Sequence, residues 1–235
     1  MGLRISPTGA SRKDGASRLV MLRGRRMTTD TDADRLPRMS TSAAPRPSVS
    51  IERYLAMEAA ATGKHILWDG EVFPVEAMAN GTPEHNTLCA NVIVALGTAL
   101  RGTRCRVMTS DQKVWVPHRK GFVYPDATFA CGRLELHPSA PDAVTNPSLI
   151  VEVLSDGTEK FDRGEKFEGY RSIPSLRHYL MVSSQRVLVE HYTRADDDAW
   201  LLRGYGAGDT VHVQRPDLAL AVDDLYALAF DADRG

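Results

Sequence analysis

The chain has 235 residues, of which 43% are hydrophobic and 25% are charged, and these proportions are ordinary for a soluble globular protein with one core. The net charge of −1 hides an uneven distribution. Residues 1–48 carry ten Lys or Arg and four Asp or Glu, which leaves 19 basic and 26 acidic residues for the rest of the chain. Because phosphate contacts need clustered cations, this acidic body excludes a protein that coats nucleic acid non-specifically. Any contact with nucleic acid would have to be local, weak or assisted by a metal.

The three cysteines, Cys89, Cys105 and Cys131, are widely spaced and form no C-x-x-C pair. Their pattern indicates neither a disulfide framework nor a zinc site. No apolar run approaches the length needed to span a membrane. These features predict a protein with reduced cysteines in the cytoplasm.

Residues 1–48 are predicted to be a disordered, basic N-terminal extension, because Arg, Ser, Thr, Asp and Pro predominate and no apolar period is sustained. A basic DNA-binding arm is the functional alternative for this stretch. Met27 and Met39 lie within it, which suggests that the native protein starts later than Met1. Residues 49–230 are predicted to form one domain.

The first half of the domain is predicted to contain a helix, a two-stranded hairpin, a long helix and a second hairpin, at residues 50–63, 65–78, 81–102 and 105–131. Ser50 and Thr82 are the expected N-caps of the two helices, and Gly63 is expected to stop the first one.

A polar loop with three prolines is predicted to lead into the second half of the domain. Its expected elements are a strand, a helix, two strands, further short antiparallel strands and a last helix, at residues 148–154, 161–172, 177–183, 186–194, 199–222 and from about 223. Asp162 and Glu165 have the spacing of a capping box at the start of the helix. This order predicts an α+β (α/β) fold with one right-handed strand–helix–strand crossover.

Two carboxylates stand in runs that otherwise indicate buried strands. Glu152 interrupts the apolar segment "SLIVEVLSDG", and Asp126 lies among aromatic and apolar residues in "FVYPDATFA". Burying a carboxylate is costly unless its charge is compensated. Two carboxylates on neighbouring strands repel each other unless one is protonated or a divalent cation lies between them. Since Mg²⁺ is often held by one or two carboxylates, water and phosphate oxygens, the pair predicts a metal site.

Lys166 lies in the helix that follows Glu152, where a long side chain can reach back towards the end of the preceding strand. An ammonium group there could orient an attacking water or neutralise a phosphate oxygen. Alone, each of these residues has an ordinary explanation, as a paired or solvent-exposed side chain. The order and spacing of Asp126, Glu152 and Lys166 favour a metal-assisted phosphodiesterase centre.

The segments "YPDATF" and "LIVEVLSDGTEKFDRGEKFEGYRSIPSLRHYLMV" resemble the Uma-two family of restriction endonuclease-like proteins, within the PD-(D/E)XK nuclease superfamily. The resemblance runs from about Ile51 to Tyr226 and includes "DGEVF" and "GTPEHN". It implies a restriction endonuclease-like core, a mixed β-sheet flanked by helices. It also implies that Asp126 and Glu152 are the superfamily's two metal-binding carboxylates. The superfamily lysine is expected two residues after the glutamate, where this chain has a leucine, and in the Uma-two pattern it corresponds to Lys166.

The resemblance also implies dependence on Mg²⁺ or Mn²⁺, double-stranded DNA as the substrate, and a homodimer. Glu84 and His85 match the family's "HN" helix entry, where a histidine could assist proton transfer or contact phosphate. A capping and packing role is the alternative for His85. Glu71 in "DGE" could approach the same metal, although an exposed strand residue is the slightly favoured interpretation.

The predicted function is therefore that of a metal-dependent endonuclease that hydrolyses DNA phosphodiester bonds. The alternative is a non-catalytic nucleic-acid- or protein-binding module that retains the nuclease fold. The acidic body favours this alternative, and the complete Asp–Glu–Lys set opposes it. Hydrolysis of RNA or of another phosphodiester is a third possibility.

Overall fold

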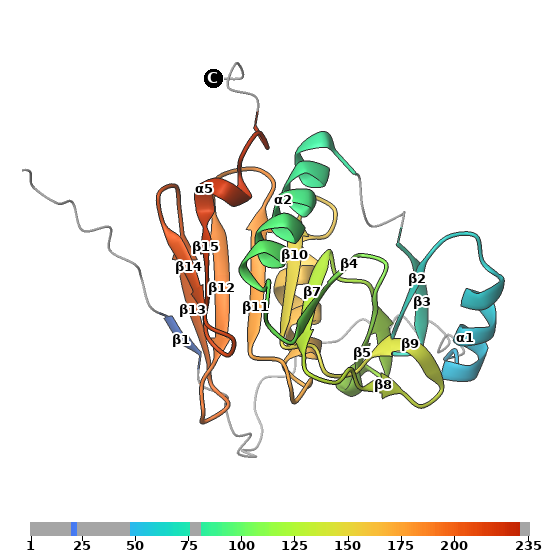
Figure 1. Cartoon of the computed structure of the whole chain (residues 1–235). Coiled ribbons are helices and arrows are strands. Elements are labelled where there is room, and N and C mark those ends of the chain that lie inside the picture. Colours follow the sequence, from blue (N-terminus) through green and yellow to red (C-terminus); the bar gives the residue numbers. More distant parts are fainter. Residues whose placement is uncertain (1–19, 23–47, 76–80, 231–235) are drawn as a thin grey trace, which may run out of the picture.

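The protein is described by a computed structural model that covers residues 48–75 and 81–230, together with the backbone of residues 20–22. Two large mixed β-sheets and a two-stranded sheet are flanked by helices in an α+β fold (Figure 1), which confirms the predicted fold class. The predicted disordered extension, 1–48, lies almost entirely outside the described residues. Within it, β1 (Val20–Leu22) pairs antiparallel with β13 (Trp200–Tyr205) at the edge of the larger sheet, so these three residues were not predicted correctly.

Helix α1 (Ile51–Ala60) begins where the sequence predicts. The Ser50 hydroxyl accepts a hydrogen bond from the Arg53 N–H at 3.2 Å, which satisfies one of the unpaired donors of the first turn. The helix ends at Ala60, before the predicted stop at Gly63, and the chain then turns into the first hairpin.

The first hairpin consists of β2 (His65–Trp68) and β3 (Glu71–Pro74), as predicted. Asp69 and Gly70 both have positive φ angles, of 48° and 79°, which is the geometry of a tight two-residue turn. The hairpin forms one edge of the six-stranded sheet, whose order is β3-β2-β6-β5-β9-β8.

Helix α2 (Pro83–Ala99) is the long predicted helix, and its N-cap is Thr82, whose hydroxyl accepts a hydrogen bond from the His85 N–H. Proline suits the first turn because its missing N–H would have no intrahelical partner there. The buried face of the helix packs on the seven-stranded sheet through Leu88, Val92 and Leu96.

The second predicted hairpin is divided between the two large sheets. Its inner strands, β5 (Lys113–Val116) and β6 (Gly121–Val123), pair around the 3-10 helix η1 (Pro117–Arg119) in the six-stranded sheet. Its outer strands, β4 (Cys105–Thr109) and β7 (Ala127–Cys131), pair in the seven-stranded sheet. Residues 124–126 therefore carry the chain from one sheet to the other, and Asp126 is the last residue of this crossing.

Two further findings differ from the sequence predictions. The proline-containing loop holds two short strands of the six-stranded sheet, β8 (Leu136–His137) and β9 (Ala140–Val144). Cys105 and Cys131, predicted to be reduced, are directly opposite each other on β4 and β7 and form a disulfide bond. Their sequence separation of 26 gave no sign of this pairing, because strand register, and not sequence spacing, brings the two cysteines together.

At the centre of the seven-stranded sheet, β10 (Leu149–Leu154) and β11 (His178–Ser183) are parallel, which confirms the predicted strand–helix–strand unit. The sheet order is β1-β13-β12-β11-β10-β7-β4. The connecting helix consists of α3 (Glu159–Phe161), the π-helical segment η2 (Asp162–Lys166) and α4 (Phe167–Tyr170). The predicted capping box is wrong, because the helix already begins at Glu159 and Asp162 lies inside it.

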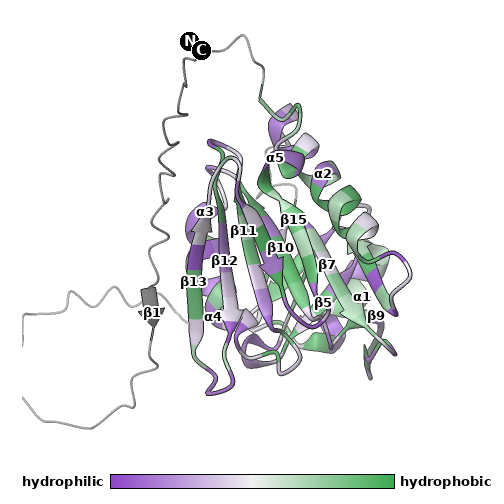
Figure 2. Cartoon of the chain, turned by 60° about the vertical axis from the view of Figure 1, so that its left-hand side comes forward, coloured by the Kyte–Doolittle hydropathy of each residue, from purple (hydrophilic) through white to green (hydrophobic). Residues whose placement is uncertain are grey.

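The last elements follow the predicted order: β12 (Val189–Arg194), β13, β14 (Thr210–Val213), β15 (Leu218–Ala221) and α5 (Val222–Leu225). Helices α2 and α5 and the β14–β15 pair pack on one face of the seven-stranded sheet. The helical connection between β10 and β11 packs on the other face. Figure 2 shows hydrophobic residues gathered on the central strands between these layers, where both faces of the sheet are covered.

Candidate metal centre

A small pocket of about 60 Å³ lies beside the C-terminal half of β10, and its lining residues are Ile66, Val75, His85, Tyr124, Asp126, Glu152, Val153, Ser155, Thr158, Asp162 and Lys166. This volume is sufficient for a cation with a few waters and too small for a whole nucleotide. All four site residues predicted from the sequence, His85, Asp126, Glu152 and Lys166, are among the lining residues. The fold thus brings together side chains from α2, the sheet crossing, β10 and η2.

Asp126 is held in place by a backbone group of the neighbouring strand. Its Oδ2 atom accepts a hydrogen bond of 2.7 Å from the Val153 N–H and lies 3.8 Å from the Nε2 atom of His85. Burial raises the pKa of Asp126 above its ordinary value, against the opposing effects of His85 and the Val153 N–H. The carboxylate is therefore fixed in orientation but electrostatically costly.

Glu152 faces the helix side of the sheet, since it alternates with Val151 and Val153, which pack on the α2 side. Its side chain is almost completely buried, and its Oε1 atom accepts a 2.6 Å hydrogen bond from the Tyr170 hydroxyl. The same oxygen lies 3.1 Å from Lys166 Nζ. Burial, together with the nearby carboxylates of Asp162 and Asp126, raises the pKa of Glu152 to about 8 despite the opposing charge of Lys166.

Lys166 is buried and bridges two carboxylates. Its Nζ atom lies 2.8 Å from Asp162 Oδ1 as well as 3.1 Å from Glu152. Burial disfavours the charged ammonium, but Glu152 and Asp162 outweigh this effect and raise the pKa of Lys166 above its ordinary value. Lys166 therefore carries its positive charge inside the pocket, at the end of a π-helical segment of the kind often found at functional sites.

Sequence reasoning missed Asp162, which is only 1% exposed and points into the pocket. The available signal was its position four residues before Lys166, which places the two side chains on one face of a helix. It was assigned instead to a capping box, because Glu165 follows it at capping spacing.

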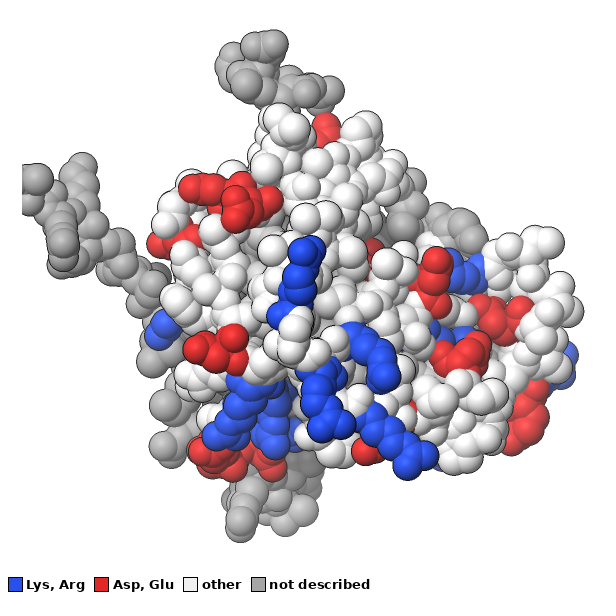
Figure 3. Space-filling model, viewed as in Figure 1, with Lys and Arg blue, Asp and Glu red and all other residues white. Residues whose placement is uncertain are grey.

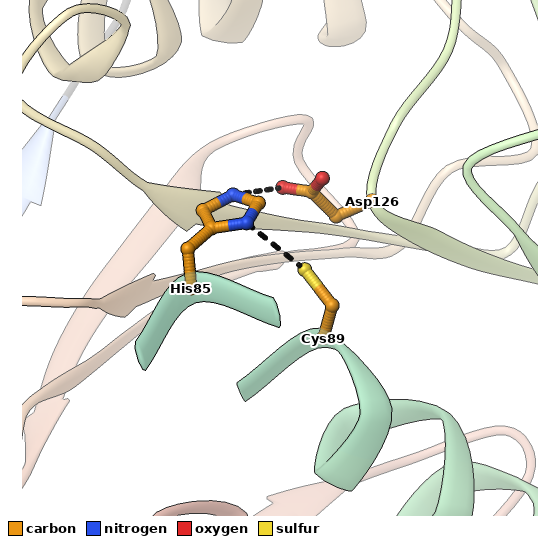
Figure 4. Close-up of side chains that lie close together, drawn as sticks. All are labelled: His85, Cys89 and Asp126. Carbon is orange, nitrogen blue, oxygen red and sulfur yellow. Dashed lines mark hydrogen bonds and ion pairs between the residues drawn. The ribbon is translucent and has the colours of Figure 1, made fainter. Parts of the chain in front are cut away.

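A second missed residue is Cys89, one turn after His85 on α2. The Cys89 Sγ atom lies 3.6 Å from His85 Nδ1, and the opposite ring nitrogen faces Asp126 (Figure 4). Among the described residues, ligand atoms of these three side chains lie within 4.8 Å of one another. Burial, followed by the charges of Asp126 and Glu152, raises the pKa of the Cys89 thiol well above its ordinary value. Cys89 is thus a protonated thiol and not an activated nucleophile.

Neither of the two additional glutamates considered from the sequence lines the pocket. Glu71 is exposed on β3, in agreement with the favoured interpretation, and Glu84 is half-buried in the first turn of α2. Among the described residues, the acidic side chains that line the pocket are therefore those of Asp126, Glu152 and Asp162.

The charge balance of the pocket fits a divalent cation. Within the described part of the chain, three carboxyl groups, those of Asp126, Glu152 and Asp162, share the pocket with one ammonium group, that of Lys166. A buried excess of negative charge is relieved either by protonation, as the raised pKa of Glu152 indicates, or by a cation. Carboxylate oxygens are the ligands that Mg²⁺ and Mn²⁺ prefer.

The protein has a nuclease-like fold. A crystal structure described as "a putative nuclease belonging to DUF820" from Anabaena variabilis ATCC 29413 matches it with a TM-score of 0.61, over 77% of this chain and 99% of that chain, at 11% sequence identity. At that identity the likeness concerns the fold alone.

The sequence model of the Uma2 family, described as "Putative restriction endonuclease", matches residues 51–223, and the chain belongs to this family. This confirms the resemblance identified from the sequence. Two proteins of Synechocystis sp. (strain ATCC 27184 / PCC 6803 / Kazusa) are similar to it. Uncharacterized protein slr1290 is 35% identical over 188 residues, 80% of this chain and 96% of its own length. Uncharacterized protein sll1609 is 35% identical over 149 residues, 63% of this chain and 82% of its own length.

Among the described helices, none is long and apolar enough to cross a membrane. The homodimer and the cytoplasmic location stay predictions. The disulfide between Cys105 and Cys131 removes one of the arguments for the predicted location, which rested on reduced cysteines.

The raised pKa of Glu152 predicts a distinct dependence of stability on pH. Between the ordinary value of 4.5 and the folded value of about 8, the folded state holds a proton that the unfolded state has lost. This contribution therefore stabilises the metal-free protein at low pH and disappears as the pH rises to about 8. In EDTA, the unmodified protein is expected to lose stability as the pH is raised from 6 to 9. The melting temperature of Glu152→Gln minus that of the unmodified protein should therefore increase over this range. Parallel curves for the two proteins would show that Glu152 titrates normally.

Proposed function

We propose that this protein is a metal-dependent endonuclease that hydrolyses phosphodiester bonds in double-stranded DNA. The observation that supports the proposal most strongly is the excess of buried carboxyl groups beside a charged lysine, in a pocket of the size of a hydrated cation. Membership in the Uma2 family, described as "Putative restriction endonuclease", supports the same reaction class.

Asp126 and Glu152 would hold Mg²⁺ or Mn²⁺, with Asp162 available as a third acidic group in the pocket. When bound there, the metal would stabilise the negative charge that develops on the phosphate and lower the pKa of a bound water. The Val153 N–H and the Tyr170 hydroxyl orient the two carboxylates. This prior orientation avoids reorganisation during the reaction.

Lys166 would donate hydrogen bonds to the attacking water or to a phosphate oxygen, since its ammonium group lines the pocket and stays charged. His85 is placed to accept or donate a proton at Nε2, on the side that faces Asp126. Its neighbour Cys89 contacts the other ring nitrogen and would hold the orientation of the ring.

The test is incubation of the full chain with supercoiled plasmid DNA and Mn²⁺, beside an identical sample in EDTA. Nicked or linear product in the Mn²⁺ sample alone is the expected result. A labelled RNA is incubated in parallel. Cleavage of the RNA and not of the plasmid would indicate the third possibility, hydrolysis of another phosphodiester. Intact plasmid at every metal concentration would count against the proposal.

A non-catalytic binding module that retains the fold is the second candidate function. It is favoured by the ion pairs that Lys166 makes with Glu152 and Asp162, because these compensate the buried charges without a metal. A metal that binds only the folded state raises the melting temperature. The endonuclease is therefore expected to gain thermal stability with Mg²⁺ or Mn²⁺, and a module with a closed ion-pair network is not.

Asp126 belongs to two possible ligand sets, which predict different metal preferences. With Glu152 it offers only oxygen ligands, which suit Mg²⁺ and Mn²⁺. With His85 and Cys89 it offers nitrogen and sulfur as well, which suit Zn²⁺. Cys89→Ser is expected to leave the thermal shift with Mn²⁺ unchanged and to weaken Zn²⁺ binding at least about tenfold by isothermal titration. Equal loss of both metals would show that Cys89 supports the pocket as a whole.

A further inference from the structure

A second pocket, of about 410 Å³, lies away from the candidate metal centre, and four arginines are among its lining residues. Its lining residues are Arg177, His178, His191, Thr193, Arg194, Ala195, Asp196, Leu201, Arg203, Tyr205, His212, Gln214 and Arg215. We call it the arginine pocket. Its volume falls within the range of small-molecule binding sites.

The arginine pocket lies on the opposite face of the seven-stranded sheet from Glu152. On β11, Leu180 and Val182 pack with the α2 side of the sheet, and His178 shares their face because side chains alternate along a strand. Glu152 on β10 faces the other way, towards Tyr170. The sheet therefore separates the two pockets, so that the arginine pocket is not a subsite of the metal centre.

The lining of the arginine pocket is strongly positive within an acidic body. Four arginines and one acidic residue, Asp196, are among its described lining residues. Arg194 is paired with Asp198 at 3.0 Å, but Arg177, Arg203 and Arg215 make no ion pair within the described residues. Figure 3 shows Lys and Arg side chains gathered over the centre and the lower part of the face it displays, with acidic side chains beside and below them as well as above and to the right.

Two buried histidines form a fixed, neutral floor for the pocket. His178 Nε2 lies 2.7 Å from the carbonyl oxygen of Gln214, which can only accept, so this nitrogen carries the proton. His178 Nδ1 is then an acceptor, and His191 Nε2, at 3.0 Å, donates to it. Burial lowers the pKa of both rings, that of His191 to about 3. The positive charge of the pocket therefore belongs to its arginines.

We propose that the arginine pocket binds a phosphate-bearing ligand, with Arg177 and Arg203 as its principal contacts. Guanidinium groups present a planar set of donors that matches phosphate oxygens in pairs. Arg203 is directly opposite His191 on the neighbouring strand, and Arg177 immediately precedes His178, so both are anchored beside the rigid histidine floor. The hydroxyl groups of Thr193 and Tyr205 add neutral hydrogen-bonding groups to the lining.

The phosphate could belong to a free nucleotide or to a nucleic-acid backbone, and the experiment separates these sources. The full chain is titrated in EDTA, so that no cleavage occurs, with inorganic phosphate, with ADP and with a short fluorescein-labelled DNA duplex. Saturable binding of ADP or phosphate indicates a nucleotide-type ligand. Binding of the duplex alone, with an affinity that falls steeply with salt, indicates a backbone phosphate.

Arg177→Gln and Arg203→Gln are each expected to weaken binding of the successful probe about tenfold or more, since each removes a charge-assisted contact. Asp196→Asn, which removes the one carboxylate of the lining, is expected to strengthen it. Arg53→Gln on the exposed surface of α1 is the matched control and is expected to have no effect. Melting curves of the variants verify that they are folded. Binding that is equal in all variants, or absent for every probe, would overturn the proposal and leave the endonuclease proposal untouched.

Discussion

Replacing Asp126 with Asn is expected to reduce Mn²⁺-dependent cleavage of supercoiled plasmid by roughly a thousandfold. The substitution removes the negative charge that a divalent cation would need at the centre of the pocket. It keeps a carbonyl oxygen that can still accept the hydrogen bond from the Val153 N–H, which is 2.7 Å long in the unmodified protein. The loss should therefore be chemical and not structural. Cleavage is measured as the initial rate of nicking on agarose gels.

The control for Asp126→Asn is Asp111→Asn, which changes an exposed carboxylate that pairs with Lys64 on the surface. The control is expected to cleave normally. In EDTA, Asp126→Asn is expected to melt no lower than the unmodified protein, because burial raises the pKa of Asp126 and its charge is a cost in the metal-free state. A folded Asp126→Asn variant with full activity would exclude Asp126 as a metal ligand.

The residues that the sequence predicted for the pocket share one kind of signal. Asp126 and Glu152 are carboxylates inside apolar strand segments, and such a contradiction between residue type and local pattern is visible without knowledge of the fold. Lys166 was identified from its position in the helix that follows the Glu152 strand. Together with the family resemblance, these local signals were sufficient to identify four of the side chains that line the pocket.

The features that were missed depend on how elements meet in space. Cys105 and Cys131 pair because β4 and β7 are neighbours in a particular register, which no spacing rule encodes. The run that contains Asp126 was predicted as one strand, although it divides between two sheets just before β7. Asp162 faces inwards because its helix begins four residues earlier than the capping pattern suggested, with Thr158 and not Asp162 as its N-cap.

The largest effect on stability is expected from Lys166→Met. This substitution leaves Glu152 and Asp162, which are 3% and 1% exposed, without their common cation. Breaking a buried ion pair by removing one partner typically costs about 3–5 kcal/mol, because a charge stays buried and uncompensated. Urea denaturation in EDTA at pH 9 is expected to show a loss of this size. Lys160→Met, at an exposed position of the same helical connection, is the matched control and should change stability little.

The cost of Lys166→Met should depend on pH through its carboxylate partners. The pKa of Lys166 itself lies above its ordinary value of 10.5, so that the ammonium is charged throughout the range from pH 6 to pH 9. Without it, the pKa of Glu152 would rise beyond about 8, and the carboxyl group would be protonated at pH 6. The destabilisation should therefore be smaller at pH 6 than at pH 9.

A double variant tests whether this loss of stability arises in the pocket. Glu152→Gln in the Lys166→Met background is expected to recover a large part of the stability at pH 9, because the two residues are in direct contact and their effects are not additive. Mn²⁺ should also stabilise Lys166→Met more than the unmodified protein, since a cation would then compensate the buried carboxylates that have lost their ammonium partner. If neither the second substitution nor Mn²⁺ restores stability, Lys166 supports the helix and not the charge balance of a metal centre.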